Sequence, residues 1–294
     1  MKETTMPKNP RYKNSNKLLR PTQYGVAIIL YNPTKEQILK IKEYNTCFEK
    51  IFIFDNSEHN HNKSYINSLK DYYYYSENEN KGLPYALNYI LETDECKELD
   101  FLCTLDQDST FKSEDILNIQ SKINSMDNKC LGIIAPYINY GYNHKKKTNK
   151  LIEKKWVITS GSFIYLKNLY NMNLRYDENY FLDRAEVDLC KQIIRSNKKI
   201  FMYYNSTLYQ RLGEDSGYKH PNHNVLRHYY IFRNRFYFNN KWYGMIKKCA
   251  LNFLQTLNHI TKIVLFEDEK IKKIKILRIA YIDYKNYEMG KYKC

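Results

Sequence analysis

The sequence predicts an α/β fold in which a mostly parallel central sheet is flanked by helices on both faces, followed by a helical C-terminal extension. Two observations predict this fold class. Between residues 24 and 135, short apolar runs typical of buried strands alternate with segments whose apolar residues recur at helical spacing. In addition, polar and acidic residues directly follow several strands, at the sheet edge where such folds bind ligands.

The individual elements follow from local patterns, taken in chain order. Strands are predicted at 26–31, 51–54, 72–75, 101–105, 131–135, 156–165 and 200–204. Helices are predicted to begin near Thr34, Leu83, Ser113, Glu186 and Arg227. Thr34 is a good N-cap residue, because its hydroxyl can accept a bond from a free main-chain N–H of the first helical turn. Pro136 is expected to close the fifth strand.

Several strands end in polar or acidic residues. These follow the strands as Tyr31-Asn32, Asp55-Asn56, Asn80-Lys81-Gly82 and Asp106-Gln107-Asp108. Asp106 and Asp108 hold hard oxygen ligands at the edge of the sheet, where a divalent cation and a diphosphate can meet them. Surface turns often carry the same Asp-x-Asp triplet, so the case for a metal site depends on what the neighbouring strands place beside it.

The composition limits the classes of partner and compartment. A formal charge of +15 implies an anionic partner, such as a nucleic acid, an acidic membrane or a phosphorylated substrate. Seven scattered cysteines without a C-x-x-C pair argue against a disulfide framework and a zinc site, and for a reducing cytoplasm. Residues 1–21 are polar and basic and predict a loose tail with no secretory signal. The longest apolar run, 24–31, is too short to span a bilayer.

A second acidic group lies near the predicted helix start at Glu186. Its members are Asp177, Glu178, Asp183, Glu186 and Asp188. Carboxylates at a helix N-terminus can simply complement the helix dipole, so the ordinary interpretation and a functional one both stay open. Gly161, in the strand-like stretch before this group, would let a ligand approach the backbone closely.

Residues 216–294 differ in character and predict a basic amphipathic extension. A first helix would gather Arg227, Tyr229, Tyr230, Arg233, Asn234 and Arg235 on one basic and aromatic face. Further cations alternate with apolar residues: Lys247, Lys248, Lys270, Lys272, Lys273, Lys275 and Arg278. This pattern is typical of helices that lie on anionic membrane surfaces, although the extension could equally pack back onto the main domain.

From about residue 24 to the C-terminus, the chain resembles the family 2 inverting glycosyltransferases with the GT-A fold, specifically their bacterial rhamnosyltransferase-like branch. The matching segments are Ile29–Pro33, Phe54–Ser57, Asn80–Asn88, Leu105–Ser109, Thr159–Gly161, Phe181–Asp188, Arg211–Gly213 and His223–Asn234. The resemblance divides the chain into the tail (1–21), a GT-A domain (22–215) that binds a nucleotide-sugar and catalyses transfer, and the extension (216–294).

The resemblance implies a role for each matched position. The nucleotide-binding residues would be Tyr31, Asn32, Asp55, Asn80, Gly82 and Asp106. Asp108, with Asp106, would hold Mg²⁺ or Mn²⁺ at the diphosphate of the donor. Glu186 would be the catalytic base, with Asp183 and Asp188 as rivals. Contacts to the acceptor or to phosphate would come from Ser160, Gly161, Arg211, His223, Arg227 and Arg233.

Two departures from the family pattern affect these assignments. The family usually has Asp at the position of Glu186 and Glu two residues later, whereas this chain has Glu186 followed by Asp188. The family also usually has His where this chain has Gln210, which puts a metal or phosphate contact from that loop in doubt. For Arg227 and Arg233, phosphate contact and intramolecular ion pairing that docks the helix are both open.

The expected activity is metal-dependent, inverting transfer of a sugar, L-rhamnose from dTDP-rhamnose, onto a lipid-pyrophosphate-linked saccharide in capsule, O-antigen or rhamnan synthesis. The enzyme would be cytoplasmic and peripheral on the anionic inner face of the cell membrane. One alternative keeps the fold and uses a UDP donor of galactose, glucose or galactofuranose. A remote alternative is a non-catalytic basic protein that binds nucleic acid, but acidic strand ends would repel a polyanion; we expect no nucleic-acid partner.

Overall fold

The computed structural model describes residues 20–59, 63–66, 72–141, 146–210 and 223–293. Its strands are β1 (Tyr24–Leu30), β2 (Lys50–Asp55), β3 (Tyr73–Ser76), β4 (Phe101–Asp106), β5 (Thr110–Phe111), β6 (Leu131–Asn139), β7 (Leu151–Glu153), β8 (Ser162–Tyr165) and β9 (Lys199–Tyr209). Its α-helices are α1 (Lys35–Lys40), α2 (Lys63–Ile66), α3 (Leu83–Glu92), α4 (Asp94–Lys97), α5 (Ser113–Asn124), α6 (Leu166–Asn171), α7 (Ala185–Arg195), α8 (Val225–Trp242), α9 (Met245–Phe266) and α10 (Lys270–Asn286). Two 3-10 helices, η1 (Ile41–Thr46) and η2 (Glu178–Tyr180), complete the described elements.

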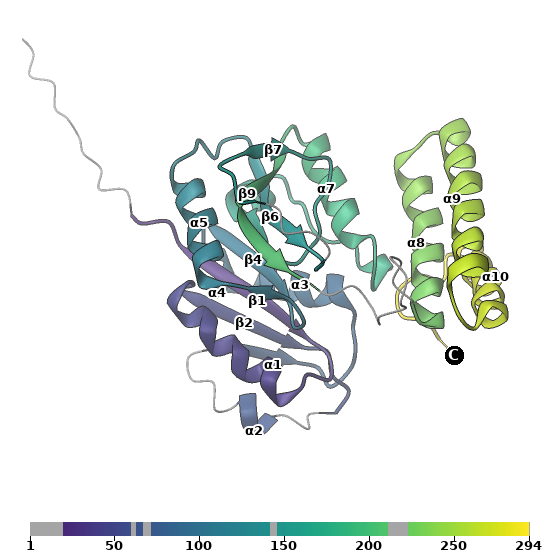
Figure 1. Ribbon diagram of the computed structural model, residues 1–294, viewed down its shortest axis with the longest axis horizontal. Helices are drawn as coiled ribbons and strands as arrows, with labels where there is room; N and C mark the ends of the chain where they lie inside the picture. Colours follow the sequence, from purple (N-terminus) through teal and green to yellow (C-terminus); the bar gives the residue numbers. More distant parts are fainter. Residues whose placement is uncertain (1–19, 60–62, 67–71, 142–145, 211–222, 294) are drawn as a thin grey trace, which may run out of the picture.

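The strands form one sheet in the order β3-β2-β1-β4-β8-β6-β9-β5, with β7 paired to β9 (Figure 1). Strands β3, β2, β1 and β4 are parallel, as predicted. The other half is mixed, because β8 runs antiparallel to both β4 and β6. A parallel neighbour needs a long crossover, usually a helix, and no helix lies between β6 and β8 among the described residues. The expectation of a mostly parallel sheet therefore holds for the N-terminal half.

Two apolar layers cover the sheet, so the predicted helices on both faces are confirmed. On one face, Ile116 and Ile119 of α5 belong to the same buried apolar cluster as Val26, Ile28 and Leu105. The other face is covered by α3, α6 and α7. The capping prediction for α1 also holds, because Thr34 and Gln37 form a reciprocal capping box.

Two strand predictions need correction. Strand β6 does not end at Pro136 but continues to Asn139. Proline lacks the N–H that a regular ladder requires, and the pairing of β6 with β9 shifts register between Pro136 and Tyr137. The strand predicted at 156–165 begins only at Ser162, after a turn in which Gly161 has a φ of +77°.

The C-terminal extension consists of α8, α9 and α10, which stand side by side at one end of the sheet domain (Figure 1). Tyr237 and Phe238 of α8 join the core beneath the sheet, while Phe232 and Phe236 pack with α9 and α10. Because α8 is covered on both sides, Tyr229, Tyr230, Arg233, Asn234 and Arg235 are buried. The expected basic and aromatic face of this helix is therefore internal.

The predicted limits of the domains fall partly outside the described residues. Most of the tail (1–21) lies there, as do residues 211–222, which contain the predicted boundary near 216. Among the helices that the structure describes, none is both long enough and apolar enough to cross a bilayer.

Candidate active site

The tips of β2 and β4 bring two of the predicted carboxylates to one edge of the sheet. β1 lies between these strands, and its Leu30 and Ile29 pair with Asp55 and Asp106, respectively. Neighbouring strands are about 4.8 Å apart, so the backbones of Asp55 and Asp106 lie within about 10 Å of each other. The predicted convergence of these strand ends is therefore present in the backbone.

Asp106 is held from two sides. Its main-chain N–H donates to Ser160 Oγ at 3.1 Å, and Gln210 Nε2 donates to its Oδ2 at 3.2 Å. Burial, reinforced by the negative charge of Asp108, raises the pKa of Asp106 to about 6. The two carboxylates thus repel each other in a partly desolvated position, an arrangement that a bound cation would relieve.

The residues at this edge suit a divalent cation that a phosphate helps to hold. Asp106 and Asp108 offer carboxylate oxygens, the donors that Mg²⁺ and Mn²⁺ prefer. No group of three or more His, Cys, Asp or Glu side chains arranged to hold an ion occurs in the described parts of the chain. Mg²⁺ commonly binds through one or two carboxylates plus substrate phosphates, and this pair fits that pattern.

Glu186 stands in the first turn of α7, immediately after an unusual turn. Three non-glycine residues before it have positive φ: Phe181 (58°), Asp183 (55°) and Arg184 (78°). The Glu186 carboxyl is partly buried, and burial, with the nearby charges of Asp183 and Asp106, raises its pKa to about 7. A carboxylate with a pKa near neutrality is suited to accept a proton as a general base.

The structure separates the two rivals of Glu186. Asp188 is completely buried and accepts hydrogen bonds from four side chains: Tyr180 (3.1 Å), Gln192 (2.7 Å), Lys241 (2.9 Å) and Trp242 (2.6 Å). This pattern is typical of a structural carboxylate, because its lone pairs are all engaged.

Asp183 instead lies beside Arg227. Its Oδ1 is 3.4 Å from Arg227 Nη2, while its Oδ2 and Arg227 Nε are both buried without a hydrogen-bond partner in the described structure. Burial raises the pKa of Asp183, and the charge of Arg227 opposes this effect. Unsatisfied polar atoms on both partners indicate a place where a polar ligand can bind.

The predicted nucleotide-binding residues form the neighbouring part of the same edge. Asp55 is buried and accepts from the Ser57 N–H (2.9 Å) and from the Tyr74 hydroxyl (3.0 Å). Asn80 Oδ1 accepts from the Gly82 N–H at 3.0 Å, and Leu83 N–H donates to Phe181 O at 2.9 Å. The loop around Gly82 therefore touches the turn that precedes Glu186.

Other predicted site residues are placed as follows. Ser160 lies next to Asp106 and donates to Ser109 Oγ at 2.7 Å, and the Gly161 N–H donates to Thr104 O at 2.7 Å. His223 lies beside the ring of His228, and burial lowers its pKa to about 4. Arg211 lies outside the described residues.

Arg233 is completely buried, which favours the interpretation that it docks the helix over phosphate contact. Its guanidinium donates to the Tyr229 hydroxyl (3.1 Å), to Asn234 Oδ1 (3.2 Å), and to the carbonyl oxygens of Glu288 (3.2 Å) and Gly290 (2.7 Å). These bonds satisfy the guanidinium within the chain, and the expected contact to the acceptor through Arg233 is not supported.

Sequence reasoning missed side chains that shape this edge. Gln107 exchanges two hydrogen bonds with the main chain of Tyr31 (2.8 and 3.0 Å), which leaves the half-exposed Tyr31 ring facing outward. Lys40 donates to Ser109 O (3.1 Å). Burial lowers the pKa of Lys40, and the nearby negative charge of Asp108 opposes this effect. Gln107 could have been suspected from its place inside the Asp-Gln-Asp triplet, whereas nothing in the sequence singles out Lys40.

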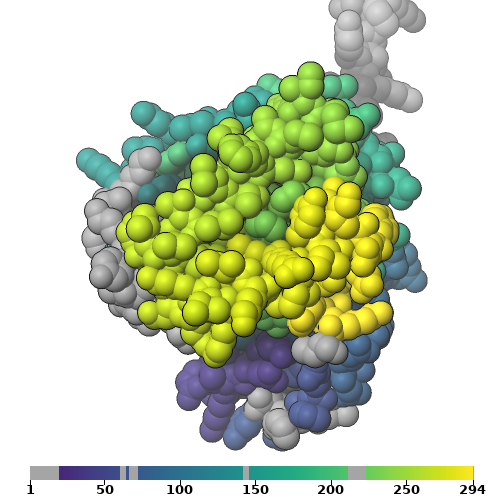
Figure 2. All heavy atoms as spheres, turned by 90° about the vertical axis from the view of Figure 1, so that its right-hand side faces the viewer, coloured from purple at the N-terminus to yellow at the C-terminus, as the bar shows by residue number. Residues whose placement is uncertain are grey.

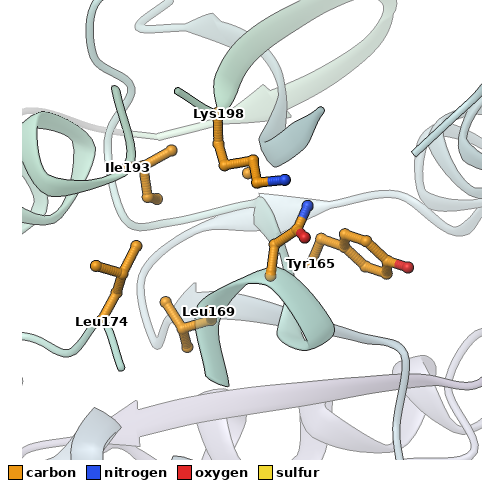
Figure 3. A pocket seen from close by; sticks show the side chains of 7 residues that line it. Tyr165, Leu169, Leu174, Ile193 and Lys198 are labelled. Atoms are coloured by element: carbon orange, nitrogen blue, oxygen red, sulfur yellow. The ribbon is translucent and has the colours of Figure 1, made fainter. Parts of the chain in front are cut away.

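Of two hollows formed by the described residues, one lies beside the carboxylates of the candidate site. One of about 240 Å³ lies against Lys40, Asp106 and Gln107, beside the carboxylates. The other, of about 180 Å³, is lined mainly by Tyr165, Leu169, Leu174, Ile193 and Lys198 (Figure 3). This second hollow lies at the start of β6 and β9, the edge of the sheet opposite to the carboxylates.

Comparisons with known proteins agree with the predicted fold. No family model matches the chain. A dTDP-rhamnosyl transferase, RfbF from Shigella flexneri, is 23% identical over 283 residues, which cover 87% of this chain and 93% of that protein. Residues 1–349 of TarS from S. aureus superpose with a TM-score of 0.50 at 11% identity, over 90% of this chain and 71% of that one.

A second solved structure also superposes on this chain. GalNAc-T7, solved with UDP, GalNAc and Mn²⁺, superposes with a TM-score of 0.52 at 11% identity. The match covers 66% of this chain and 44% of that structure. At such identities the superpositions establish the fold alone. The predictions of fold and resemblance are therefore confirmed: the chain has a GT-A fold and is similar to glycosyltransferases, including a rhamnosyltransferase.

Proposed function

We propose that this chain is an inverting glycosyltransferase that moves L-rhamnose from dTDP-rhamnose onto a lipid-pyrophosphate-linked saccharide in cell-surface polysaccharide synthesis. One observation carries the proposal: Glu186, with a pKa near neutrality, lies within electrostatic reach of Asp106, whose neighbour Asp108 completes a carboxylate pair suited to a cation. The similarity to a dTDP-rhamnosyl transferase over most of both chains supports the choice of donor.

The donor would lie along the strand tips. Its base and ribose would meet Tyr31, Asn32 and Asp55, with the Asn80–Gly82 loop forming the wall beside them. Its diphosphate would reach Asp106 and Asp108, the residues that would hold Mg²⁺ or Mn²⁺. When bound, the cation would supply charge neutralisation for the departing nucleoside diphosphate.

Transfer would be a single displacement. Glu186 would take the proton from the acceptor hydroxyl while that oxygen bonds to the anomeric carbon of the sugar. The bond from this carbon to the diphosphate oxygen breaks at the same time, and its electron pair leaves with the nucleoside diphosphate. Because attack and departure occur on opposite faces, the anomeric configuration inverts. The unsatisfied atoms of Asp183 and Arg227 would hold the acceptor near Glu186.

The outer face of the extension supports a peripheral position on an anionic membrane. Figure 2 shows α9 and α10 forming this face of the molecule. His259 and Ile263 turn the inner side of α9 towards the core, and its outer side exposes large apolar residues. The most exposed are Ile246 (88%), Phe253 (70%), Met245 (69%), Leu265 (61%), Leu254 (60%) and Leu257 (56%).

The helices that carry this apolar strip also expose cations, as binding to anionic lipid would require. Lys247, Lys262, Lys270, Lys272 and Lys275 are exposed on α9 and α10, whereas Lys273 is buried against Glu267. Helices with one apolar and one cationic side lie in the headgroup region of anionic bilayers. A position there would bring the active site to a lipid-linked acceptor.

The activity is tested with purified full-length protein, Mn²⁺ or Mg²⁺, and a panel of donors: dTDP-rhamnose, UDP-galactose, UDP-glucose and UDP-galactofuranose. The true donor should raise the melting temperature most, because only the folded protein binds it. Glu186→Gln should bind that donor but transfer at a rate lower by about 100-fold or more, as for loss of a general base. Glu153→Gln, an exposed surface change, is the matched control. A UDP sugar that alone stabilises the protein would replace dTDP-rhamnose with the alternative donor class.

The membrane position is tested by sedimentation with vesicles of phosphatidylglycerol and phosphatidylcholine, and with vesicles of phosphatidylcholine alone. Binding should require the anionic lipid and be lost in a Phe253→Ser, Leu257→Ser variant. Leu117→Ser removes a similarly exposed leucine from α5 and should bind normally. If the apolar strip instead joins two copies of the chain, light scattering would show a dimer that the double variant dissociates, and the membrane proposal would be wrong.

A further inference from the structure

The turn just before the proposed base Glu186 has backbone angles that are unfavourable for the residues in it. Phe181, Asp183 and Arg184 all have φ between 55° and 78°, a region that L-residues other than glycine rarely occupy. Such conformations persist only when the surrounding structure imposes them. The question is therefore which contact holds this turn in place.

The contact comes from Asn234, which lies on α8 and is completely buried. Its Nδ2 lies 2.8 Å from Tyr180 O, 2.5 Å from Leu182 O and 3.0 Å from Asp183 O. One amide group is thus within hydrogen-bonding distance of three carbonyl oxygens of the strained turn. Serine or threonine would offer one donor hydrogen, and aspartate would offer none.

Arg233 fixes this amide and ties the turn to the C-terminal segment. Its Nε donates to Asn234 Oδ1 at 3.2 Å, which orients the Nδ2 group towards the turn. Its other nitrogens donate to the carbonyl oxygens of Glu288 and Gly290. The Gly290 N–H then donates to Asn179 O at 2.9 Å, at the beginning of the same turn. The bonds form a closed circuit around residues 179–183.

We propose that Asn234 is a positioning residue for transfer: by holding residues 180–183 from α8, it places Asp183 and Glu186 opposite the strand-tip carboxylates. The inference rests on the proposed function, because it concerns the geometry of the same base. In the proposed function the donor binds mainly to the strand tips and the Gly82 loop, whereas the Asn234 amide donates to Tyr180, Leu182 and Asp183. Removal of the Asn234 amide should therefore lower kcat without weakening the binding of the donor.

The experiment compares Asn234→Ala and Asn234→Asp with Asn239→Ala. Asn239 is a matched control, because it is also buried on α8 and its Nδ2 donates to Asn252 Oδ1 (2.7 Å) and Gln255 Oε1 (3.0 Å), away from the turn. Both Asn234 variants should lower kcat by about 100-fold, as for a base displaced by about 1 Å, with KM for the donor unchanged. Asn239→Ala should lower the melting temperature and retain kcat.

Each result decides the inference. Normal kcat in folded Asn234→Ala would overturn it, as would an equal loss of kcat in Asn239→Ala. If neither Asn234 variant binds donor, the asparagine is a folding residue and the inference is also wrong. A wild-type protein that transfers no sugar contradicts the proposed function instead, so the two failures are distinguished.

Discussion

His228 Nδ1 and His259 Nε2 lie 2.8 Å apart in the buried seam between α8 and α9. His228 Nε2 faces Glu267 Oε2 at 2.7 Å, and Arg235 Nη1 lies 3.4 Å from His259 Nδ1. The arrangement assigns a proton to Nε2 of each neutral ring, so that each N–H meets an acceptor and Arg235 donates to the remaining nitrogen. Protonation of His228 at Nδ1 would place two N–H groups opposite each other. Protonation of His259 at Nδ1 would place a second positive charge beside Arg235.

This relationship predicts that the protein loses stability as the pH falls below about 6.5. Burial lowers the pKa of His228, and burial with the charge of Arg235 lowers that of His259 to about 3. The unfolded chain, with a histidine pKa of about 6.5, binds these protons first, so the free energy of unfolding decreases as pH falls. His259 should contribute a loss of about 2 kcal/mol between pH 6.5 and 5, and His228 a further loss in the same direction. Urea denaturation measures this, and His259→Gln should make the pH dependence shallower; an unchanged slope would contradict the assignment.

The pKa of Glu186 predicts how activity depends on pH. A base acts in its deprotonated form, and burial raises the pKa of Glu186 to about 7. The value of kcat/KM should therefore rise with pH up to about 7 and level off above it, because this parameter reports the free enzyme. Initial rates of transfer between pH 5.5 and 8.5 test this. A profile that is flat between pH 6 and 8 would argue for another base.

Asp188 should stabilise the fold and take no direct part in transfer. Asp188→Ala removes the acceptor of the hydrogen bonds from Tyr180 and Trp242, while Lys241 keeps its ion pair with Asp177. We expect the free energy of unfolding to fall by about 3 kcal/mol or more, because each buried donor left without an acceptor costs about 1–3 kcal/mol. Guanidinium denaturation measures the loss, with Glu186→Gln as the comparison that should unfold like wild type. A stable Asp188→Asn variant that transfers no sugar, beside an active Glu186→Gln, would make Asp188 the base.

Asp108 should couple the metal to donor binding. With wild type, Mn²⁺ should increase the stabilisation that the donor provides, because both ligands bind only the folded site. Asp108→Asn should lose this increase, about 2.7 kcal/mol at a ligand concentration 100 times its dissociation constant. Asp94→Asn changes an exposed aspartate of α4 and should keep it. Equal metal effects in wild type and Asp108→Asn would refute the metal assignment.

Gly82 and Gly141 offer a comparison of backbone strain with and without a clash. Their φ angles are 89° and 88°, but a Cβ on Gly82 would lie 2.5 Å from Phe181 O, whereas a Cβ on Gly141 would meet no described residue within 4 Å. Gly141→Ala should cost about 1 kcal/mol of unfolding free energy. Gly82→Ala should cost about 2–4 kcal/mol and weaken donor binding, because it pushes the nucleotide loop away from the acidic turn. Denaturation and donor titration of both variants test this, and equal costs would contradict the close approach.

Some parts of the fold could not be predicted from local patterns. The sequence around Pro136 signals a strand end, yet pairing with β9 carries β6 past the proline because a shift in register absorbs the missing N–H. Similarly, nothing near Ser162 states that β8 will enter the sheet antiparallel to β4 and β6. Strand direction depends on the path of the whole chain, which no local segment encodes.

The sequence by itself determined the types and order of most elements, the capping of α1 by Thr34, and the acidic residues at the tips of β2 and β4. These features depend on neighbours a few residues away, through periodicity, capping and turn chemistry. Only the tertiary structure decided that Arg233 is internal, that Asp188 is saturated with hydrogen bonds and that Asn234 reaches the turn before Glu186. These outcomes depend on partners about 50 residues away or more, since hydrogen bonds and desolvation are set by which side chains folding brings together.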